Sequence, residues 1–222
     1  MDAIRDPPTS LEGAIARDER LLRTGAPAVR VAVLREAGVS FGVGTPKDGA
    51  AEANARRLGL PTVRRSTGGT GILHLPGDLI WSVVLPRSDP LVGPDFSSAY
   101  GRLGAGLVLF LADRSLDARW SEPEALSDEF CLLGRRGRAL TVDGRVLGGA
   151  AQHVTASALL HHGVVGGTLD RGLIERVFSL PAEITASRLT ALTELGISDA
   201  PDSLADDLGR VLAASIGRRR PR

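Results

Sequence analysis

The spacing of apolar residues predicts a helix followed by strands at the start of the chain. Ser10 can cap a helix that ends near Thr24 and Gly25, and apolar residues recur in it every three or four positions. These apolar residues are Leu11, Ala14, Ile15, Leu21 and Leu22. Alternating apolar residues over 29–33 predict a half-buried strand, and 39–43 is predicted to be its hairpin partner.

Short elements flank a glycine-rich loop in the next part of the chain. Residues 50–58 have the pattern of a short helix, and 61–65 are expected to be extended and to lead into the loop. After the loop, the apolar runs 72–74 and 79–85 predict two strands that pair around a turn at residues 76–78. Strand pairs are therefore expected on both sides of the loop.

A long helical pattern and further strands follow. Apolar residues over 95–111 repeat at spacings of three and four, and such a stripe must cover a sheet. Strands are predicted at 139–142, 145–151 and 159–168. The first two of these are expected to form a hairpin, because the dipeptide Asp143–Gly144 favours a two-residue turn.

Helical patterns return at the end and complete the predicted fold class. They cover 189–195 and 204–216, with Ser203 as the expected cap of the second. Strands joined by hairpins, with helices before, between and after them, are typical of an α+β domain with a mainly antiparallel sheet flanked by helices. We expect one domain over 1–222, with a helical C-terminal part over about 171–222.

Composition excludes several classes of protein. The 222 residues carry 27 basic and 26 acidic side chains, and this net charge of +1 gives no long-range field for nucleic acid or an anionic membrane. No run of about 18 apolar residues predicts a membrane span, and the N-terminal MDAIRDPP lacks the apolar region of a secretion signal. The single cysteine, Cys131, excludes an internal disulfide, so a cytoplasmic location is expected.

The segment RRSTGGTG, residues 64–71, is the first candidate for chemistry. Its glycines let backbone N–H groups come close to a ligand, and an arginine can bind a carboxylate or phosphate through two hydrogen bonds. We interpret it as an anion clamp, the alternative being a hairpin loop with solvated arginines. It is not a Walker loop, because GxxxxGK[ST] is absent. The candidate binding residues are Arg64, Arg65, Thr67, Gly68, Gly69, Thr70 and Gly71.

Two later segments carry small residues and histidines. The stretch DGRVLGGAAQH, residues 143–153, is rich in small residues, so a slender ligand or another backbone can lie against it. In LLHHGVVGG, residues 159–167, His161 and His162 face opposite sides of the predicted strand. No metal site is expected, because no ligand spacing indicates one. A structural, hydrogen-bonded role for these histidines is the alternative to a catalytic one.

Cys131 lies in the segment DEFCLL, between two large apolar residues. A lone cysteine in such a place is usually a small buried residue. As a nucleophile it needs a nearby cation or base, and the sequence by itself pairs it with none.

Taken in their order, these segments resemble the lipoate-protein ligase and octanoyltransferase family of the biotin/lipoate ligase superfamily. The matching residues are Ser40–Gly42, RRSTGGTGILHLPGDLIWS over 64–82, GRVLGGAAQ over 144–152, and His162 with Gly163. In the second segment Thr67 stands for the family's serine and Thr70 for its third glycine.

The resemblance implies a fold and a substrate class. The fold would be like that of class II aminoacyl-tRNA synthetases, with an acyl tunnel over the face of the sheet. The activity would move an octanoyl or lipoyl group, with a lipoyl carrier domain or an acyl carrier protein as partner. An eight-carbon chain needs a narrow apolar slot, which small residues permit. The implied binding residues also include Gly148, Gly149, Ala150, His162 and Gly163.

The family contains two mechanisms. In its cysteine-dependent members the nucleophile lies about fourteen residues before the arginine of a GRK motif, and Cys131 lies that far before Arg145. Such a transferase requires no cofactor, whereas an ATP-dependent ligase uses ATP and Mg²⁺ to form an acyl-adenylate. The cysteine mechanism requires the thiol and the arginine–glycine segment to meet at the mouth of one apolar channel.

One departure from the family pattern affects the expected chemistry. The family's lysine falls on Val146, which offers neither charge nor hydrogen-bond donor. Arg145 or Arg65 is then expected to supply the charge, and His74 or His162 to move the proton. The predicted catalytic residues are Cys131, Arg145, His74 and His162. A degenerate protein that binds lipoyl groups or carriers without turnover is an alternative, and an ATP-dependent ligase is another.

Overall fold

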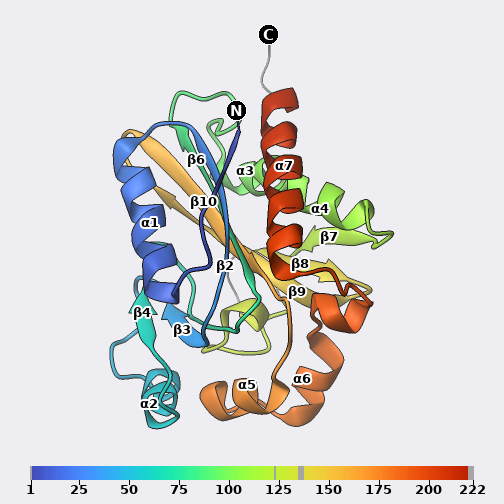
Figure 1. Ribbon diagram of the computed structural model, residues 1–222. Helices are drawn as coiled ribbons and strands as arrows, with labels where there is room; N and C mark the ends of the chain where they lie inside the picture. Colours follow the sequence, from blue (N-terminus) through green and yellow to red (C-terminus); the bar gives the residue numbers. More distant parts are fainter. Residues whose placement is uncertain (1, 123, 135–137, 220–222) are drawn as a thin grey trace.

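Two sheets organise the computed structural model, which describes residues 2–122, 124–134 and 138–219 (Figure 1). The larger sheet of the described chain contains, in spatial order, β1 (Ala3–Arg5), β2 (Ala28–Val33), β6 (Leu79–Pro86), β10 (Ala158–Val165), β9 (Arg145–Val154), β8 (Arg138–Val142) and β7 (Ala118–Ser121). The smaller sheet contains β4 (Thr62–Arg64), β3 (Gly38–Phe41) and β5 (Gly71–His74). The pairs β1–β2 and β3–β4 are parallel and the other pairs of these named strands are antiparallel, so the predicted fold class is confirmed.

Helices lie on both faces of the larger sheet. In chain order the helices of the described chain are α1 (Leu11–Thr24), α2 (Ala50–Arg57), α3 (Phe96–Leu103), α4 (Ala105–Ala112), α5 (Arg171–Phe178), α6 (Ala182–Arg188) and α7 (Pro201–Arg219), of which α2 and α5 pack against the smaller sheet. Figure 1 shows α1 on one face and α4 with α7 on the other. The main core, which includes Trp81 and Phe110, lies under α4 and α7. Among the described residues, no helix is long and apolar enough to cross a bilayer.

The first helix forms as the sequence predicts. The Ser10 hydroxyl accepts a hydrogen bond from the Gly13 N–H, and the helix ends at Gly25, whose φ of 64° is left-handed. Its buried face includes a charged residue, Asp18, in line with the apolar Ala14, Ile15 and Leu22. A carboxylate in an apolar stripe requires a buried partner, which the site provides.

The predicted hairpins in the first half of the chain are wrong, although the strands exist. Strand β2 pairs with β1 and β6, whereas β3 pairs with β4 and β5 in the other sheet. Likewise β5 and β6 do not pair with each other. The turn between β5 and β6 does not form a hairpin. Its Gly77 N–H donates to the Leu34 carbonyl, and Asp78 accepts the N–H groups of Leu75 and Gly167. Apolar alternation reveals a strand but does not name its neighbour.

Two other predictions have different outcomes. The β8–β9 hairpin is confirmed, and its turn residues Asp143 and Gly144 have positive φ angles of 49° and 74°. The predicted helix over 95–111 is interrupted at Gly104, where the Trp120 ring occupies the space of a side chain: a Cβ would lie 2.6 Å from its Nε1. Trp120 also donates a hydrogen bond to the Gly104 carbonyl.

The C-terminal part is helical, but two of its boundaries differ from the prediction. Residues 192–195 form only a 3₁₀ turn, while α6 ends just before residue 189. Ser203 does not cap α7, because that helix already begins at Pro201, whose fixed φ suits the first helical position.

Candidate active site

Cys131 is held at the start of a single 3₁₀ turn, η1 (Cys131–Leu133), which contacts β5, β8 and β9. The segment before it is anchored twice. Gly71 N–H donates to the Glu129 carbonyl over 2.8 Å, and the buried Phe130 ring packs against Phe178 with 4.7 Å between centroids. The thiol is free and half-buried. The sulfur is therefore fixed in place and still reachable.

The glycine-rich loop passes directly beside this sulfur. Gly69 has a φ of 90°, and a Cβ there would lie 2.4 Å from Cys131 Sγ and 3.0 Å from an Arg65 guanidinium nitrogen. Only glycine satisfies both the angle and the space. Gly42 supports the loop from behind, since its N–H donates to the Thr70 carbonyl. The expected meeting of the thiol and the arginine–glycine segment is thus confirmed.

Arg65 is the cation at the thiol. Its Nη2 lies 3.8 Å from Cys131 Sγ, and the side chain is only 4% exposed. The other contacts of the guanidinium are to neutral oxygens: the Ser40 carbonyl and hydroxyl, and the carbonyls of Gly68 and Thr70. Burial lowers the pKa of Arg65, and the negative charge of a Cys131 thiolate raises it. The arginine thus places a buried positive charge next to the sulfur.

His74 lies behind Arg65 and is neutral. Its Nε2 is 2.9 Å from the Ser40 hydroxyl, which also accepts from Arg65. Burial, followed by the charges of Arg65 and His162, lowers the pKa of His74 to about 3. The premise that this histidine titrates in the ordinary range is therefore wrong, and His74 does not carry a proton near neutral pH. It helps to orient Ser40, and through it Arg65.

His162 joins the loop to the first helix. Its Nε2 is 2.8 Å from the Thr67 hydroxyl and its Nδ1 is 2.8 Å from an oxygen of Asp18. The other Asp18 oxygen accepts from Arg30, which also donates to Asp6. Burial disfavours the charge of Asp18, but the hydrogen bond and charge of His162, with the charge of Arg30, hold the pKa of this carboxyl below its usual value. The chain of contacts fixes Thr67 and thus the loop.

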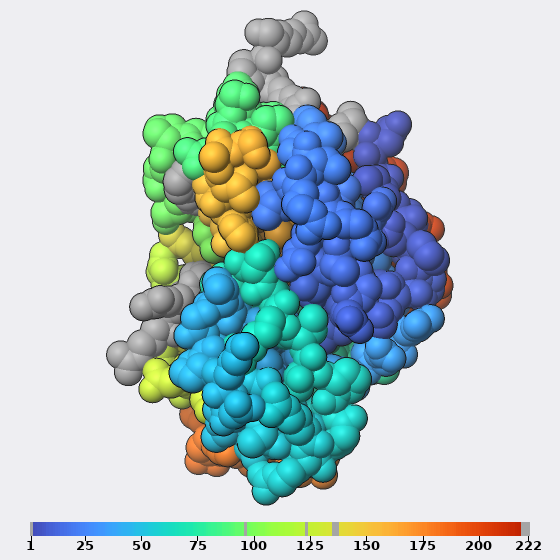
Figure 2. Space-filling view, turned by 90° about the vertical axis from the view of Figure 1, so that its left-hand side faces the viewer, coloured from blue at the N-terminus to red at the C-terminus, as the bar shows by residue number. Residues whose placement is uncertain are grey.

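Asp18 and Arg30 were not predicted as site residues. Asp18 was detectable, because it interrupts the apolar stripe of the first helix. Arg30 gave a weaker signal as a polar residue in an alternating strand, and it is fully buried here. Seen from the side of α1, N-terminal residues in blue and cyan cover most of the surface (Figure 2).

Cys131 lines two cavities of different character. The first is a narrow slot with a cavity volume of about 40 Å³. Its walls are mainly apolar: Ile15, Ile72, Ile80, Leu132, Ala139, Gly149, Ala150, Ala151, Gly163 and Val164, with Ser40, Arg65, His74, Arg138 and His162. The second is larger and polar, and it includes Thr45, Gly68, Gly69, Thr70, Tyr100, Ser127, Asp128 and Gln152. The first cavity is suited to an acyl chain and the second to a polar group attached to it.

Most predicted binding residues line one of these cavities. They are Arg65, Gly68, Gly69, Thr70, Gly149, Ala150, His162 and Gly163. Three others have supporting positions. Thr67 is buried against His162, Gly71 gives room to the Phe178 ring, and Gly148 lets β9 approach the Val164 carbonyl.

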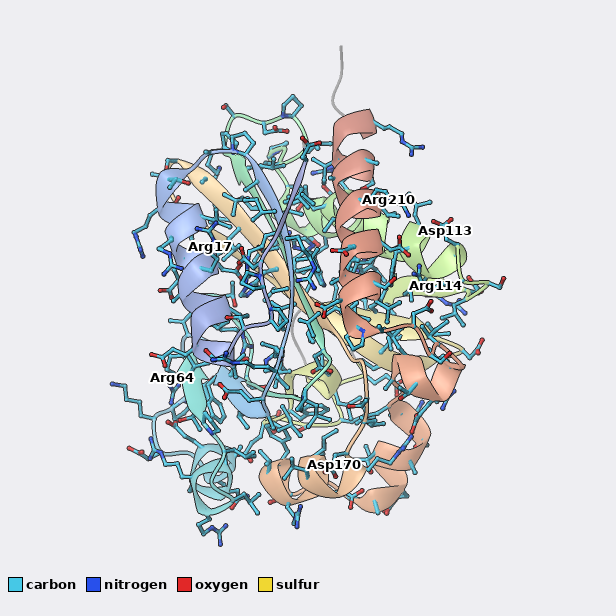
Figure 3. All side chains as sticks on the ribbon, viewed as in Figure 1. Arg17, Arg64, Asp113, Arg114, Asp170 and Arg210 are labelled. Carbon is cyan, nitrogen blue, oxygen red and sulfur yellow. The ribbon has the colours of Figure 1, made fainter. Side chains whose placement is uncertain are left out.

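Two predicted arginines lie elsewhere. Arg64 stacks on Phe41 with 5.4 Å between its guanidinium carbon and the ring centroid, and it pairs with Glu52 at 2.5 Å; Figure 3 shows it beside β4. Arg145 lies 4.0 Å from Glu194 and lines neither cavity. Of the two arginines expected to replace the family lysine, the structure therefore brings only Arg65 to the thiol. Val146, at the lysine position, is buried among apolar residues.

The comparisons with known proteins agree with one another. Residues 13–207 match the family model of the lipoyl protein ligase A/B catalytic domain. The octanoyltransferase LipM of Geobacillus kaustophilus is 31% identical over 143 residues, which cover 60% of this chain and 51% of that protein. The chain thus spans about half the length of such curated relatives. The LipM of Carboxydothermus hydrogenoformans is 28% identical over 192 residues, covering 82% of this chain and 71% of that protein.

Solved structures show the same fold. A lipoate-protein ligase A bound with ATP superposes with a TM-score of 0.78 at 22% identity, covering 98% of this chain and 86% of that one. A putative lipoate protein ligase from T. acidophilum with bound lipoic acid gives 0.75 at 21% identity, with coverages of 98% and 87%. With the family match over most of its length, this chain belongs to the lipoyl protein ligase A/B catalytic domain family.

Proposed function

We propose that this chain transfers an octanoyl or lipoyl group to the lysine of a lipoyl carrier domain through a thioester on Cys131. The observation that supports this most is the position of the sulfur, which lines both an apolar and a polar cavity and lies 3.8 Å from Arg65. The names of the octanoyltransferase relatives agree with it. Because α1, the glycine loop and η1 all contribute to one site, we treat residues 1–222 as one catalytic domain, acting where Cys131 stays reduced.

The chemistry follows from this arrangement. The Cys131 thiolate attacks the carbonyl carbon of an acyl thioester, and the donor sulfur leaves as its thiol after taking a proton. The acyl chain then lies in the apolar cavity, bound to Cys131 as a new thioester. The carrier lysine, as a free amine, attacks this carbonyl; an amide forms and Cys131 is released. The Arg65 guanidinium, with its Nη2 3.8 Å from the sulfur, is a nearby donor for the oxyanion.

Arg65 supplies the positive charge that the family lysine would bring to the thiol, but not its ability to exchange a proton. A guanidinium gives positive charge and hydrogen bonds, but it does not lose its proton readily. Its role is therefore electrostatic, and the carrier lysine must lose its proton to another group or to water. Of the two steps, acylation of Cys131 is therefore the one that the site supports best, because transfer to the carrier lysine also requires a group that accepts its proton.

An ATP-dependent ligase is the second reading of the family, and the polar cavity argues against it. Among its described lining residues none is lysine or arginine, and one, Asp128, is acidic. A triphosphate is usually bound by cationic side chains, and the described lining residues include none. An uncharged group that carries the acyl thioester suits such a cavity better than a triphosphate does. We therefore propose that no cofactor is required.

Intact-mass measurement tests the proposal. The protein is incubated with octanoyl-acyl carrier protein, and separately with octanoate, ATP and Mg²⁺. We expect an adduct of octanoyl mass from the thioester alone, lost in Cys131→Ser, and transfer of that mass to an added lipoyl domain. Labelling only with ATP would contradict the proposal and support a ligase.

The variant Val146→Lys separates a working enzyme from a degenerate one. If the wild-type chain binds a lipoyl domain without any covalent change and activity appears only with the restored lysine, the native protein is a binding protein. Acylation of the wild type at a rate within tenfold of Val146→Lys supports Arg65 as sufficient. Arg65→Met should then abolish the adduct in both backgrounds.

A further inference from the structure

A second apolar cavity adjoins the acyl slot. Its volume is about 40 Å³, the same as that of the slot. Its apolar lining residues are Leu73, Leu75, Phe130, Leu132, Val146, Leu147, Val164, Leu169, Ile174 and Leu189. Two of them, Leu132 and Val164, also line the slot that contains Cys131. These two side chains therefore form the wall between the cavities.

Leu132 is the part of this wall that a substitution can change without touching the sheet. It follows Cys131 directly in η1, and its Cδ2 lies 2.7 Å from the point where a Cβ on Gly149 would be. Val164 lies in the middle of the larger sheet, is 4% exposed and is fixed by pairing with both neighbouring strands. A change at residue 132 therefore alters the wall without altering the sheet.

The residue at the family's lysine position makes the second cavity apolar. Val146 is one of its lining residues, where a lysine would bring an ammonium group. Asp78 is the ionisable residue among the described lining residues, and both of its carboxylate oxygens accept backbone N–H groups, from Leu75 and Gly167. The space behind Leu132 is thus suited to hydrocarbon.

We propose that Leu132 sets the acyl-chain length of this protein, and that the cavity behind it is a binding site for the distal carbons of acyl chains longer than octanoyl. This inference rests on the proposed function. With leucine in place the wall ends the slot; with a smaller residue the two cavities join. The substrates gained are saturated acyl thioesters of ten to fourteen carbons.

Acylation of Cys131 by a series of acyl-carrier thioesters from six to fourteen carbons tests this. In Leu132→Ala the rate for dodecanoyl relative to octanoyl should rise by about tenfold or more, since a single methylene in an apolar pocket already changes a rate by about that factor. Filling the second cavity in the double variant Leu132→Ala with Val146→Phe should remove the gain. Leu109→Ala, an exposed leucine on α4, is the matched control and should keep the wild-type profile.

The outcomes separate this inference from the proposed function. If the wild type forms no acyl adduct with any chain, the proposed function fails. If the wild type is acylated by octanoyl but Leu132→Ala leaves the length profile unchanged, or if Ile15→Ala lengthens it instead, the inference is overturned while the function stands. A thermal melt and the rate of Cys131 alkylation show whether Leu132→Ala is folded with an intact thiol. Should it not be, Leu132→Val is used under the same criteria.

Discussion

His161 and His162 are neighbours on β10, but they face opposite sides of the larger sheet. His162 faces α1 and uses both ring nitrogens, on Asp18 and Thr67. His161 is fully buried on the other side, and neither of its nitrogens has a hydrogen-bond partner among the described residues. Its ring lies 5.0 Å from Trp81 and 5.1 Å from Tyr100, between centroids.

The difference lies in what each face contributes to the site. On the α1 face, a chain of charged and polar groups ends at the loop beside the thiol, so His162 is tied to the chemistry. On the other face, packing alone holds His161, and burial, followed by the charge of His162, lowers the pKa of His161 to about 3. Two identical residues, both buried, therefore have different roles, and burial by itself does not identify a functional histidine.

The largest effect is expected for Asp18→Ala. It removes one of the two counter-charges of the buried Arg30, the other being Asp6, and removing one partner of a buried ion pair costs about 3–5 kcal/mol of folding free energy. Urea unfolding measures it. Asp206→Ala, in an exposed pair with Arg5, is the control and should lie within about 1 kcal/mol of wild type. Equal effects of the two variants would contradict the importance of the buried network.

Gly69→Ala should affect activity more than stability. The added Cβ would overlap Cys131 Sγ, so the sulfur or the loop must move by an ångström or more, and such a misplacement costs about 10²-fold in rate. Acylation of Cys131, followed by mass, gives the rate. Gly59→Ala also forces a residue with positive φ, 70°, but meets nothing within 4 Å. A similar loss of rate in both variants would show that strain, and not contact with the thiol, is responsible.

His162→Leu should lower the free energy of unfolding by about 2 kcal/mol, because it removes two buried hydrogen bonds, with the Thr67 hydroxyl and with Asp18, although Asp18 keeps its pair with Arg30. Acylation of Cys131 should also slow, since the loop loses its tie to α1. Denaturant titration and the acylation assay measure the two effects. Wild-type values in both measurements would contradict the conclusion that His162 is tied to the chemistry of the site.

His161→Leu should have the smallest effect near neutral pH and a distinct pH dependence. Replacing a buried, unpaired imidazole by an apolar side chain of similar size is neutral or stabilising. In the wild type the unfolded histidine binds a proton below its ordinary pKa of 6.5, whereas the folded one does so only near 3. Stability is therefore complete above pH 6.5 and is lost as the pH falls toward 3. Unfolding curves across this window should be flatter for His161→Leu.

Much of the fold was predictable because the spacing of apolar residues indicates whether a segment is a strand or a helix. The first helix and the β8–β9 turn depend on local contacts, Ser10 with Gly13 and the positive φ of Asp143 and Gly144, so local sequence was sufficient. The pairing of β3 with β5 was not predictable, because the local sequence does not show that these strands belong to a different sheet from β2 and β6.

The candidate site was predicted in part, for a similar reason. The arginine–glycine segment was recognisable as a motif. That Cys131 lies beside it could be predicted only from the resemblance to the family, because the two are far apart in the sequence. Arg145 was expected to supply the charge of the family lysine, which falls on Val146, but its contact with Glu194 depends on the C-terminal part. Asp18 had no motif, and its partner His162 lies far along the chain.

The contact between Asp18 and His162 spans 144 positions. Contacts between such distant residues close late in folding, since the entropy of the intervening chain must be overcome first. During synthesis the first helix is made long before β10 exists, so its carboxylate can pair with Arg30 early but meets His162 only after more than half of the protein has emerged. The catalytic loop is consequently among the last parts to acquire its final shape, and an unfinished chain has no working thiol site.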